Sequence, residues 1–254
     1  MRGIILTAAA LVISLGLAVP AQASGGAKLP DHGWSFEGLF GEFDKPAIQR
    51  GFQVYQEVCA GCHGVKYLSF RNLAEVGFDE GAVKAIAAEY DIEDGPDDEG
   101  EMYDRPGLPS DGIPEPFAND NAARASNNGA LPPDLSLMAK ARKDGANYLY
   151  ALMTGYDDEP DDMELADGMS YNHYFPGNQI AMPPPLFEDG VEYADGTPAT
   201  VEQMAEDVTH FLMWAAEPSL EVRKRMGLKV MLFLLVLTAL LYASKRMVWA
   251  NVKH

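Results

Sequence analysis

Apolar residues recur with the period of an α-helix in two segments that lie far apart in the chain. In residues 47–58, four apolar side chains fall near one helical face: Ile48, Phe52, Tyr55 and Val58. In residues 197–216, seven share a face: Val201, Met204, Ala205, Val208, Phe211, Leu212 and Ala215. Thr197-Pro198 is expected to cap and open this later helix, and Pro218 to end it. Because Gly51 permits close approach of another helix, the pattern predicts that the two helices pack across each other.

A third apolar segment has no polar face. Residues 230–244 form a run of fifteen mostly apolar residues. Counted from Gly227, with Lys229 extending its charge towards water, the helix reaches eighteen residues, roughly 27 Å, which is enough to cross the hydrocarbon layer. Tyr242 and Trp249 suit a membrane interface. A buried core helix is the alternative, but such a helix is not normally apolar all round and flanked by basic residues. We therefore predict a transmembrane anchor over residues 223–245.

The amino terminus has the pattern of an export signal. Arg2 is followed by an apolar stretch from Ile4 to Ala18, and Ala21-Gln22-Ala23 resembles a cleavage site. An uncleaved anchor is the alternative. The pattern predicts a cleaved signal peptide over residues 1–23 and an exported body over residues 24–222.

Basic residues flank the anchor on both sides, so they do not decide its orientation: Arg223, Lys224, Arg225 and Lys229, then Lys245, Arg246 and Lys253. The signal peptide decides it instead. We expect a single-pass protein of a bacterial inner membrane, with the body on the periplasmic side and residues 246–254 as a cytoplasmic tail.

Charge is divided unevenly along the 254 residues. The whole chain has a net charge of −19, and residues 24–222 hold 11 Lys and Arg against all 38 Asp and Glu, a net charge of −27. Such acidity excludes nucleic-acid binding through phosphate contacts. Acidic runs at residues 89–101 and 157–162 are expected to be solvated loops. The alternative is an electronegative surface that steers a basic soluble partner.

The two cysteines of the chain lie in Cys59-Ala60-Gly61-Cys62-His63, the C-x-x-C-H attachment signal for c-type haem. Residues three apart share a face of a helical turn, so two thiols can form thioethers with the two haem vinyl groups. His63 can then bind the iron. The alternatives are a redox-active pair, a structural disulfide or half of a zinc site. The motif predicts one covalently bound haem c per chain.

A second axial ligand must come from elsewhere in the chain. Met182 lies in Ala181-Met182-Pro183-Pro184-Pro185, where three prolines predict a stiff extended loop. His173 is the second candidate, whereas His210 falls opposite the apolar stripe of its helix and is expected to be solvated. Methionine–histidine ligation fills both axial positions, which favours electron transfer over oxygen or peroxide chemistry. Arg124 is a candidate partner for a haem propionate or an ordinary surface arginine.

Longer motifs in the same order resemble the cytochrome c1 family. They include Trp34-Ser35-Phe36-Glu37-Gly38, Arg50-Gly51-Phe52-Gln53-Val54-Tyr55, Cys59 to His63, Leu152-Met153-Thr154-Gly155-Tyr156, Tyr174-Phe175-Pro176-Gly177 and Met182-Pro183-Pro184-Pro185. The resemblance implies a mainly α fold: a class I cytochrome c-like haem domain with long loops and one C-terminal transmembrane helix. It also implies that Cys59 and Cys62 hold the haem, that His63 and Met182 ligate its iron, and that Arg124 faces a propionate.

The same resemblance implies a non-catalytic electron-transfer subunit of an enzyme complex, the ubiquinol–cytochrome c oxidoreductase or cytochrome bc1 complex. Its expected partners are cytochrome b, the Rieske iron-sulfur protein as donor, a soluble cytochrome c as acceptor, and membrane lipid, in a dimeric complex. The alternatives are a stand-alone membrane-anchored c-type cytochrome and a haem enzyme or gas sensor. Some bacterial relatives carry an extra cysteine pair ahead of the methionine loop, and this chain has none.

Overall fold

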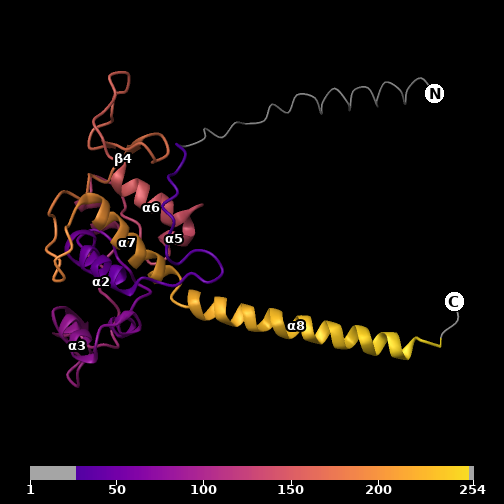
Figure 1. The fold of residues 1–254 in the computed structure, drawn as a ribbon. Helices are drawn as coiled ribbons and strands as arrows, with labels where there is room; N and C mark the ends of the chain where they lie inside the picture. Colours follow the sequence, from indigo (N-terminus) through magenta and orange to yellow (C-terminus); the bar gives the residue numbers. More distant parts are fainter. Residues whose placement is uncertain (1–26, 252–254) are drawn as a thin grey trace, which may run out of the picture.

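The structure is a computed structural model that describes residues 27–251. The predicted signal peptide, residues 1–23, and the last three residues of the predicted tail lie outside the described residues. Short helices and long connections form a body from which one long helix extends (Figure 1).

The described elements are mainly helical, as predicted. The helices are α2 (Lys45–Val54), the π-helical turn η1 (Tyr55–Cys59), the 3-10 helix η2 (Phe70–Val76), α3 (Glu80–Ala88), α4 (Asp120–Ser126), α5 (Met138–Ala141), α6 (Gly145–Thr154), α7 (Val201–Ala216) and α8 (Leu220–Val248). Two short antiparallel pairs join β1 (Asp91–Asp94) to β2 (Tyr103–Pro106) and β3 (Ser170–Tyr171) to β4 (Gln179–Ile180).

The predicted crossing of an early and a late helix is confirmed. Helices α2 and α7 pack together at the centre of the body, and α5 and α6 also contact α7 (Figure 1). Gly51 lies directly against the backbone carbonyl of Asp207, so any side chain at this position would overlap α7. Around this contact the ring centroid of Phe211 lies 5.6 Å from that of Phe52 and 5.4 Å from that of Tyr55. The apolar stripes of the two helices therefore form the centre of the core.

The predicted start of the late helix is wrong by about one turn. Helix α7 begins at Val201, and the hydroxyl of Thr200 accepts a hydrogen bond from the Gln203 amide at 3.1 Å. Thr197 lies before the helix, because its amide donates to the Asp195 carboxylate at 2.9 Å and closes a local turn. A second Thr three residues later therefore caps the helix.

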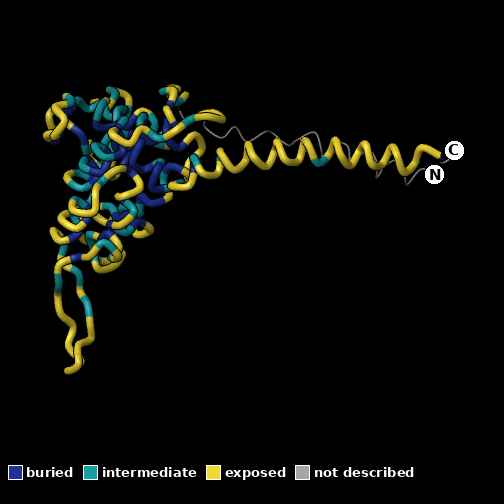
Figure 2. The backbone as a smooth tube through the Cα atoms, turned by 60° about the horizontal axis from the view of Figure 1, so that its bottom comes forward, coloured by how far each residue is buried: buried dark blue, intermediate teal, exposed yellow. Residues whose placement is uncertain are grey.

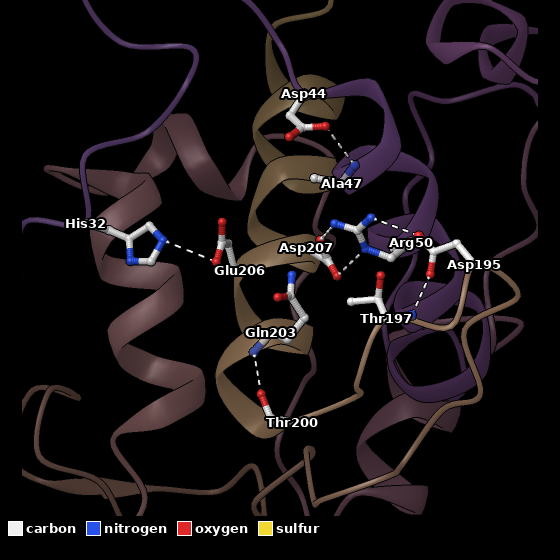
Figure 3. A network of polar contacts seen from close by, with 10 residues as sticks. All are labelled: His32, Asp44, Ala47, Arg50, Asp195, Thr197, Thr200, Gln203, Glu206 and Asp207. Carbon is white, nitrogen blue, oxygen red and sulfur yellow. Dashed lines mark hydrogen bonds and ion pairs between the residues drawn. The ribbon is translucent and has the colours of Figure 1, made fainter.

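A polar clamp joins α2 to α7 beside their apolar contact (Figure 3). Arg50 donates from Nε and Nη2 to the two carboxylate oxygens of Asp207, at 2.9 and 2.8 Å, and from Nη1 to Asp195 at 3.1 Å. The Asp207 side chain is fully buried, whereas that of Asp195 is 46% exposed. Burial raises the pKa of Asp207, and the Arg50 guanidinium opposes that shift.

His210 is buried, contrary to the prediction that it is solvated. The rings of Trp34 and Phe36 contact it edge-on, each with a centroid separation of 5.3 Å. The N-terminal segment thus covers the face of α7 opposite its apolar stripe, and both faces of the helix are buried. Burial lowers the pKa of His210.

The first acidic run is only partly a loop. Its residues 91–94 form β1, which pairs with β2 in an exposed hairpin. Arg105 stabilises the base of this hairpin by donating to Asp94 at 2.5 Å and to Asp111 at 2.6 Å. The second run, residues 157–162, has no regular strand or helix and is mostly exposed, as expected.

Helix α8 is 29 residues long, has a mean hydropathy of 2.2 in its most apolar window, and none of that window is buried within the chain. Figure 2 shows it exposed along its length beside a body whose buried residues lie inside. Its length and composition are sufficient to cross a membrane, and its exposure does not fit a core helix.

Candidate functional site

The C-x-x-C-H motif lies where the first long helix ends. Cys59 is the last residue of η1, and the amides of Cys62 and His63 both donate to its carbonyl, at 3.1 and 2.9 Å. The buried Tyr55 hydroxyl donates to the carbonyl of His63 at 3.0 Å and holds the end of this turn. Cys59 is buried, Cys62 is exposed, and both thiols are free, which does not support a structural disulfide. Burial raises the pKa of Cys59 to about 12.

The imidazole of His63 is oriented by a neighbouring loop. Its Nδ1 lies 2.7 Å from the carbonyl oxygen of Pro133. Because a carbonyl can only accept, Nδ1 carries the proton and Nε2 keeps its lone pair. Burial lowers the pKa of His63, which favours the neutral ring. A neutral imidazole whose other nitrogen donates to a carbonyl is the usual form of a histidine that binds a metal.

The loop that orients His63 is itself attached to the residues after the motif. The amide of Leu135 donates to the carbonyl of Gly64 at 2.8 Å, and the amide of Lys66 donates to the Asp134 carboxylate at 3.0 Å. Leu135 is buried in the same core as Cys59. The loop that presents the Pro133 carbonyl to His63 is therefore fixed to the chain that follows the motif.

The methionine loop is held by hydrogen bonds and packing. Met182 is half-buried, and its carbonyl accepts a hydrogen bond from the Tyr156 hydroxyl at 3.1 Å. Downstream of the three prolines, Leu186 is buried in the main core. These contacts show how the loop is stabilised without an extra disulfide.

Asn172, which sequence reasoning missed, organises the chain before this loop. Its side chain is fully buried, donates to the carbonyl of Leu152 at 2.8 Å and accepts from the amides of Tyr174 and Phe175 at 3.0 and 3.2 Å. Residue 172 also forms a β-bridge with Tyr156. In the sequence, Asn172 directly precedes the candidate ligand His173, and Tyr156 ends the Leu152–Tyr156 motif. Neither position indicated a structural role for its own side chain.

Arg124 lies on the helix whose C-terminal end reaches the cysteine motif. It is exposed on α4, with Nη1 donating to the carbonyl of Gly129 at 3.1 Å. Asn127, which follows α4, places its side-chain oxygen 3.8 Å from the sulfur of Cys62. The segment that carries Arg124 is thus next to Cys62, and its remaining guanidinium donors are available to an anionic group.

Other candidate ligands have different surroundings. His173 is exposed, and its Nε2 lies 3.1 Å from a carboxylate oxygen of Asp157 in the second acidic run. Within residues 27–251, there is no group of three or more His, Cys, Asp and Glu side chains that could hold a metal ion, so the described residues do not support a zinc site. Two free thiols beside a neutral imidazole fit a covalently attached haem instead.

Comparison with known proteins agrees with this chemistry. Residues 34–252 match the family model described as the Cytochrome C1 family. Cytochrome c1 of Rhodospirillum rubrum is 51% identical, with 98% of this chain and 97% of that protein aligned. A protein of Arabidopsis thaliana named "Cytochrome c1 2, heme protein, mitochondrial" is also 51% identical, over 91% of this chain and 76% of its own length. "Cytochrome b/c1" of Bradyrhizobium diazoefficiens is 47% identical over 96% of this chain, which spans 39% of that longer protein. Since the matched region, residues 34–252, contains every described helix and strand, the chain belongs to the cytochrome c1 family.

Proposed function

We infer that the chain transfers electrons as the haem-bearing subunit of a cytochrome bc1 complex. This role follows from membership of the cytochrome c1 family. Cytochrome b is a partner because a relative aligned over 96% of this chain is named for both proteins. The observation that best supports the role is the geometry of the C-x-x-C-H turn, in which two free thiols precede a histidine with an available Nε2.

We propose that Cys59 and Cys62 attach one haem c per chain through thioether bonds. Each S–H adds across a vinyl group, so attachment needs no oxidant. When bound, the haem supplies a one-electron redox couple at its iron. Nε2 of His63 and the sulfur of Met182 would bind its iron. The Pro133 carbonyl holds the tautomer of His63, and the Arg124 guanidinium is proposed to offset a propionate.

The role of Met182 can be tested by changing it alone. Met182→Leu is expected to lower the reduction potential and to open the iron to carbon monoxide, because the thioether no longer occupies the sixth position. Met102→Leu, at an exposed methionine beside β2, is the matched control and should change neither property. Potentiometric titration and carbon monoxide difference spectra measure both effects, and an unchanged potential in Met182→Leu would refute the assignment.

Haem attachment has its own test. A pyridine haemochrome spectrum of the purified chain should show a haem with two thioether bonds and one haem per polypeptide. Cys59→Ala and Cys62→Ala should each change the spectrum to that of a haem with a single thioether. A mature chain that lacks any haemochrome would contradict the proposed function as a whole.

The proposed topology follows from α8 and the export pattern. We propose cleavage after residue 23, a periplasmic domain over residues 24–222, an anchor over residues 223–245 surrounded by membrane lipid, and a cytoplasmic tail over residues 246–254. Protease treatment of intact spheroplasts should then degrade the domain, and a reporter fused to the tail should remain protected. Protection of the domain would overturn this orientation.

The proposed electron donor is the Rieske iron-sulfur protein, and the proposed acceptor is a soluble cytochrome c, within a dimeric complex. Purification in mild detergent should recover the chain with cytochrome b and an iron-sulfur subunit. Isolation of the chain by itself would favour a stand-alone membrane cytochrome.

A further inference from the structure

A turn at the junction of the body and α8 exposes two large apolar side chains. Leu39 and Phe40 are 60% and 78% exposed, whereas Trp34 and Phe36, just before them, are buried. The turn is closed by a hydrogen bond from the amide of Glu42 to the carbonyl of Ser35 at 3.0 Å. Two adjacent, largely exposed apolar residues at the tip of a closed turn form a small apolar patch, which is a candidate contact site.

This turn is fastened to the start of α8. The ammonium of Lys224 donates to the carbonyls of Phe36 and Gly41, at 2.6 and 3.1 Å. The amide of Phe43 donates to a carboxylate oxygen of Glu221 at 2.9 Å. Figure 1 shows the N-terminal segment, in indigo, looping beside this end of the helix. The turn therefore keeps a fixed position relative to the anchor.

The turn lies near the depth at which α8 enters the membrane. Leu39 and Phe40 line a hollow of about 110 Å³ together with Arg225 and Leu228 of α8. Lys224, which holds the turn, precedes the uninterrupted apolar run at Val230 by six residues, about 9 Å along the helix. Counted from Gly227, where the predicted eighteen-residue span begins, the separation is three residues, or about 4.5 Å. The turn therefore lies within the headgroup layer, which is about 5–8 Å thick on each side of the bilayer.

The charges around the turn also suit a lipid surface. The body has a net charge of −27 over residues 24–222, yet this end of α8 has four basic residues: Arg223, Lys224, Arg225 and Lys229. Arg225 and Lys229 are exposed. Glu42 and Glu221 also line the hollow, but Glu221 is engaged by Phe43 and by Arg225, at 3.7 Å. Exposed cations beside exposed apolar side chains are typical of a segment that lies in a phospholipid interface.

We propose that Leu39 and Phe40 form a second membrane contact, inserted among phospholipid chains beside α8 and held at that depth by Lys224. Together with the helix, this contact fixes the tilt of the body above the membrane. The inference rests on membrane anchoring by α8 and goes beyond it, because Leu39 and Phe40 belong to the body and lie outside the spanning helix.

Photocrosslinking within the intact complex in native membranes tests the proposal. Phe40 is replaced by p-benzoylphenylalanine and the membranes are irradiated. The mass of the peptide that contains position 40 is then measured. An adduct with a phospholipid is expected. The same replacement at Phe187, which is 65% exposed on the body, is the matched control and should give no lipid adduct. Crosslinking of position 40 to a protein subunit, or no crosslink at all, would overturn the proposal.

Two further variants separate the possible failures. The photoprobe at Leu235, 68% exposed in the apolar part of α8, must capture lipid if the helix spans the membrane. Lipid capture at position 235 without capture at position 40 rejects the second contact alone, and loss at both positions rejects the anchor and with it the proposal. Lys224→Met should reduce the lipid adduct at position 40 but not at position 235, and an unchanged yield at position 40 would contradict its positioning role.

Discussion

Replacing Arg50 with methionine is expected to destabilise the body strongly, because it leaves the fully buried carboxylate of Asp207 without its charged partner. Removing one member of a buried ion pair typically costs about 3–5 kcal/mol, out of a total stability of about 5–15 kcal/mol for a domain. For a domain of this size each kcal/mol lowers the melting temperature by about 2–4 °C, so a decrease on the order of 10 °C is expected. Asp195, the other partner of Arg50, is hydrated and contributes little of this loss.

The assay is thermal unfolding of the full chain in mild detergent, followed by circular dichroism. Detergent keeps the apolar α8 helical, so the transition reports on the body. Lys84→Met is the matched control, because Lys84 pairs with Glu80 on an exposed face of α3, and its loss should change the melting temperature very little. The double variant Arg50→Met with Asp207→Leu should recover most of the lost stability, since it removes the buried charge itself.

The effect of pH gives an independent check. Burial already raises the pKa of Asp207, and loss of Arg50 raises it further. The folded variant then binds a proton that the unfolded chain releases, so its stability relative to the native chain should recover as pH falls through that raised pKa. If Arg50→Met lowers the melting temperature no more than Lys84→Met does, the clamp does not hold α2 against α7.

Three other predictions concern the crossing of α2 and α7, the buried His210 and the acidic surface of the body. Gly51→Ala should cost about 1–3 kcal/mol in the same unfolding assay, because its methyl group overlaps the Asp207 carbonyl, and a neutral effect would contradict the close crossing of α2 and α7. Because burial lowers the pKa of His210 below 6.5, the folded chain resists protonation and loses stability as pH falls below that value. His210→Phe should therefore melt with a weaker dependence on pH between about 7 and 5 than the native chain, and equal dependence would contradict the burial of this ring. Raising the ionic strength above about 0.1 M should slow reduction of a basic cytochrome c by the complex, because the acidic body attracts it at long range, and a salt-independent rate would reject this steering.

Most predictions that rest on neighbouring residues along the chain are confirmed where the structure tests them. The apolar stripes of residues 47–58 and 201–215 do form the contact between α2 and α7. The turn geometry of the cysteine motif also follows from local spacing, because residues three apart in a helical turn share a face. By contrast, the cap at Thr197 was wrong, since the side chain of Asp195 captures its amide and Thr200 is equally suited to capping.

Two other errors concern residues whose partners are distant in sequence. His210 has a polar position in its own helix, and only Trp34 and Phe36, more than 170 positions earlier, make it buried. The first acidic run reads as a loop by composition, yet part of it forms a strand because residues 103–106 pair with it. In both cases the helical period or the composition indicated the local character of the segment correctly. Neither indicated which distant segment packs against it or pairs with it.

The sequence by itself determined the helices of the core, the membrane-spanning length of α8 and the C-x-x-C-H motif, because each depends on the spacing of nearby residues along one segment. Tertiary structure alone decided that Pro133 orients His63, that Tyr156 secures the Met182 loop and that Lys224 fastens the Leu39–Phe40 turn to α8. Each of these contacts joins a side chain to a backbone carbonyl tens of residues away or more. Carbonyl groups are present at nearly every residue, so only the folded path of the chain selects which one is within reach.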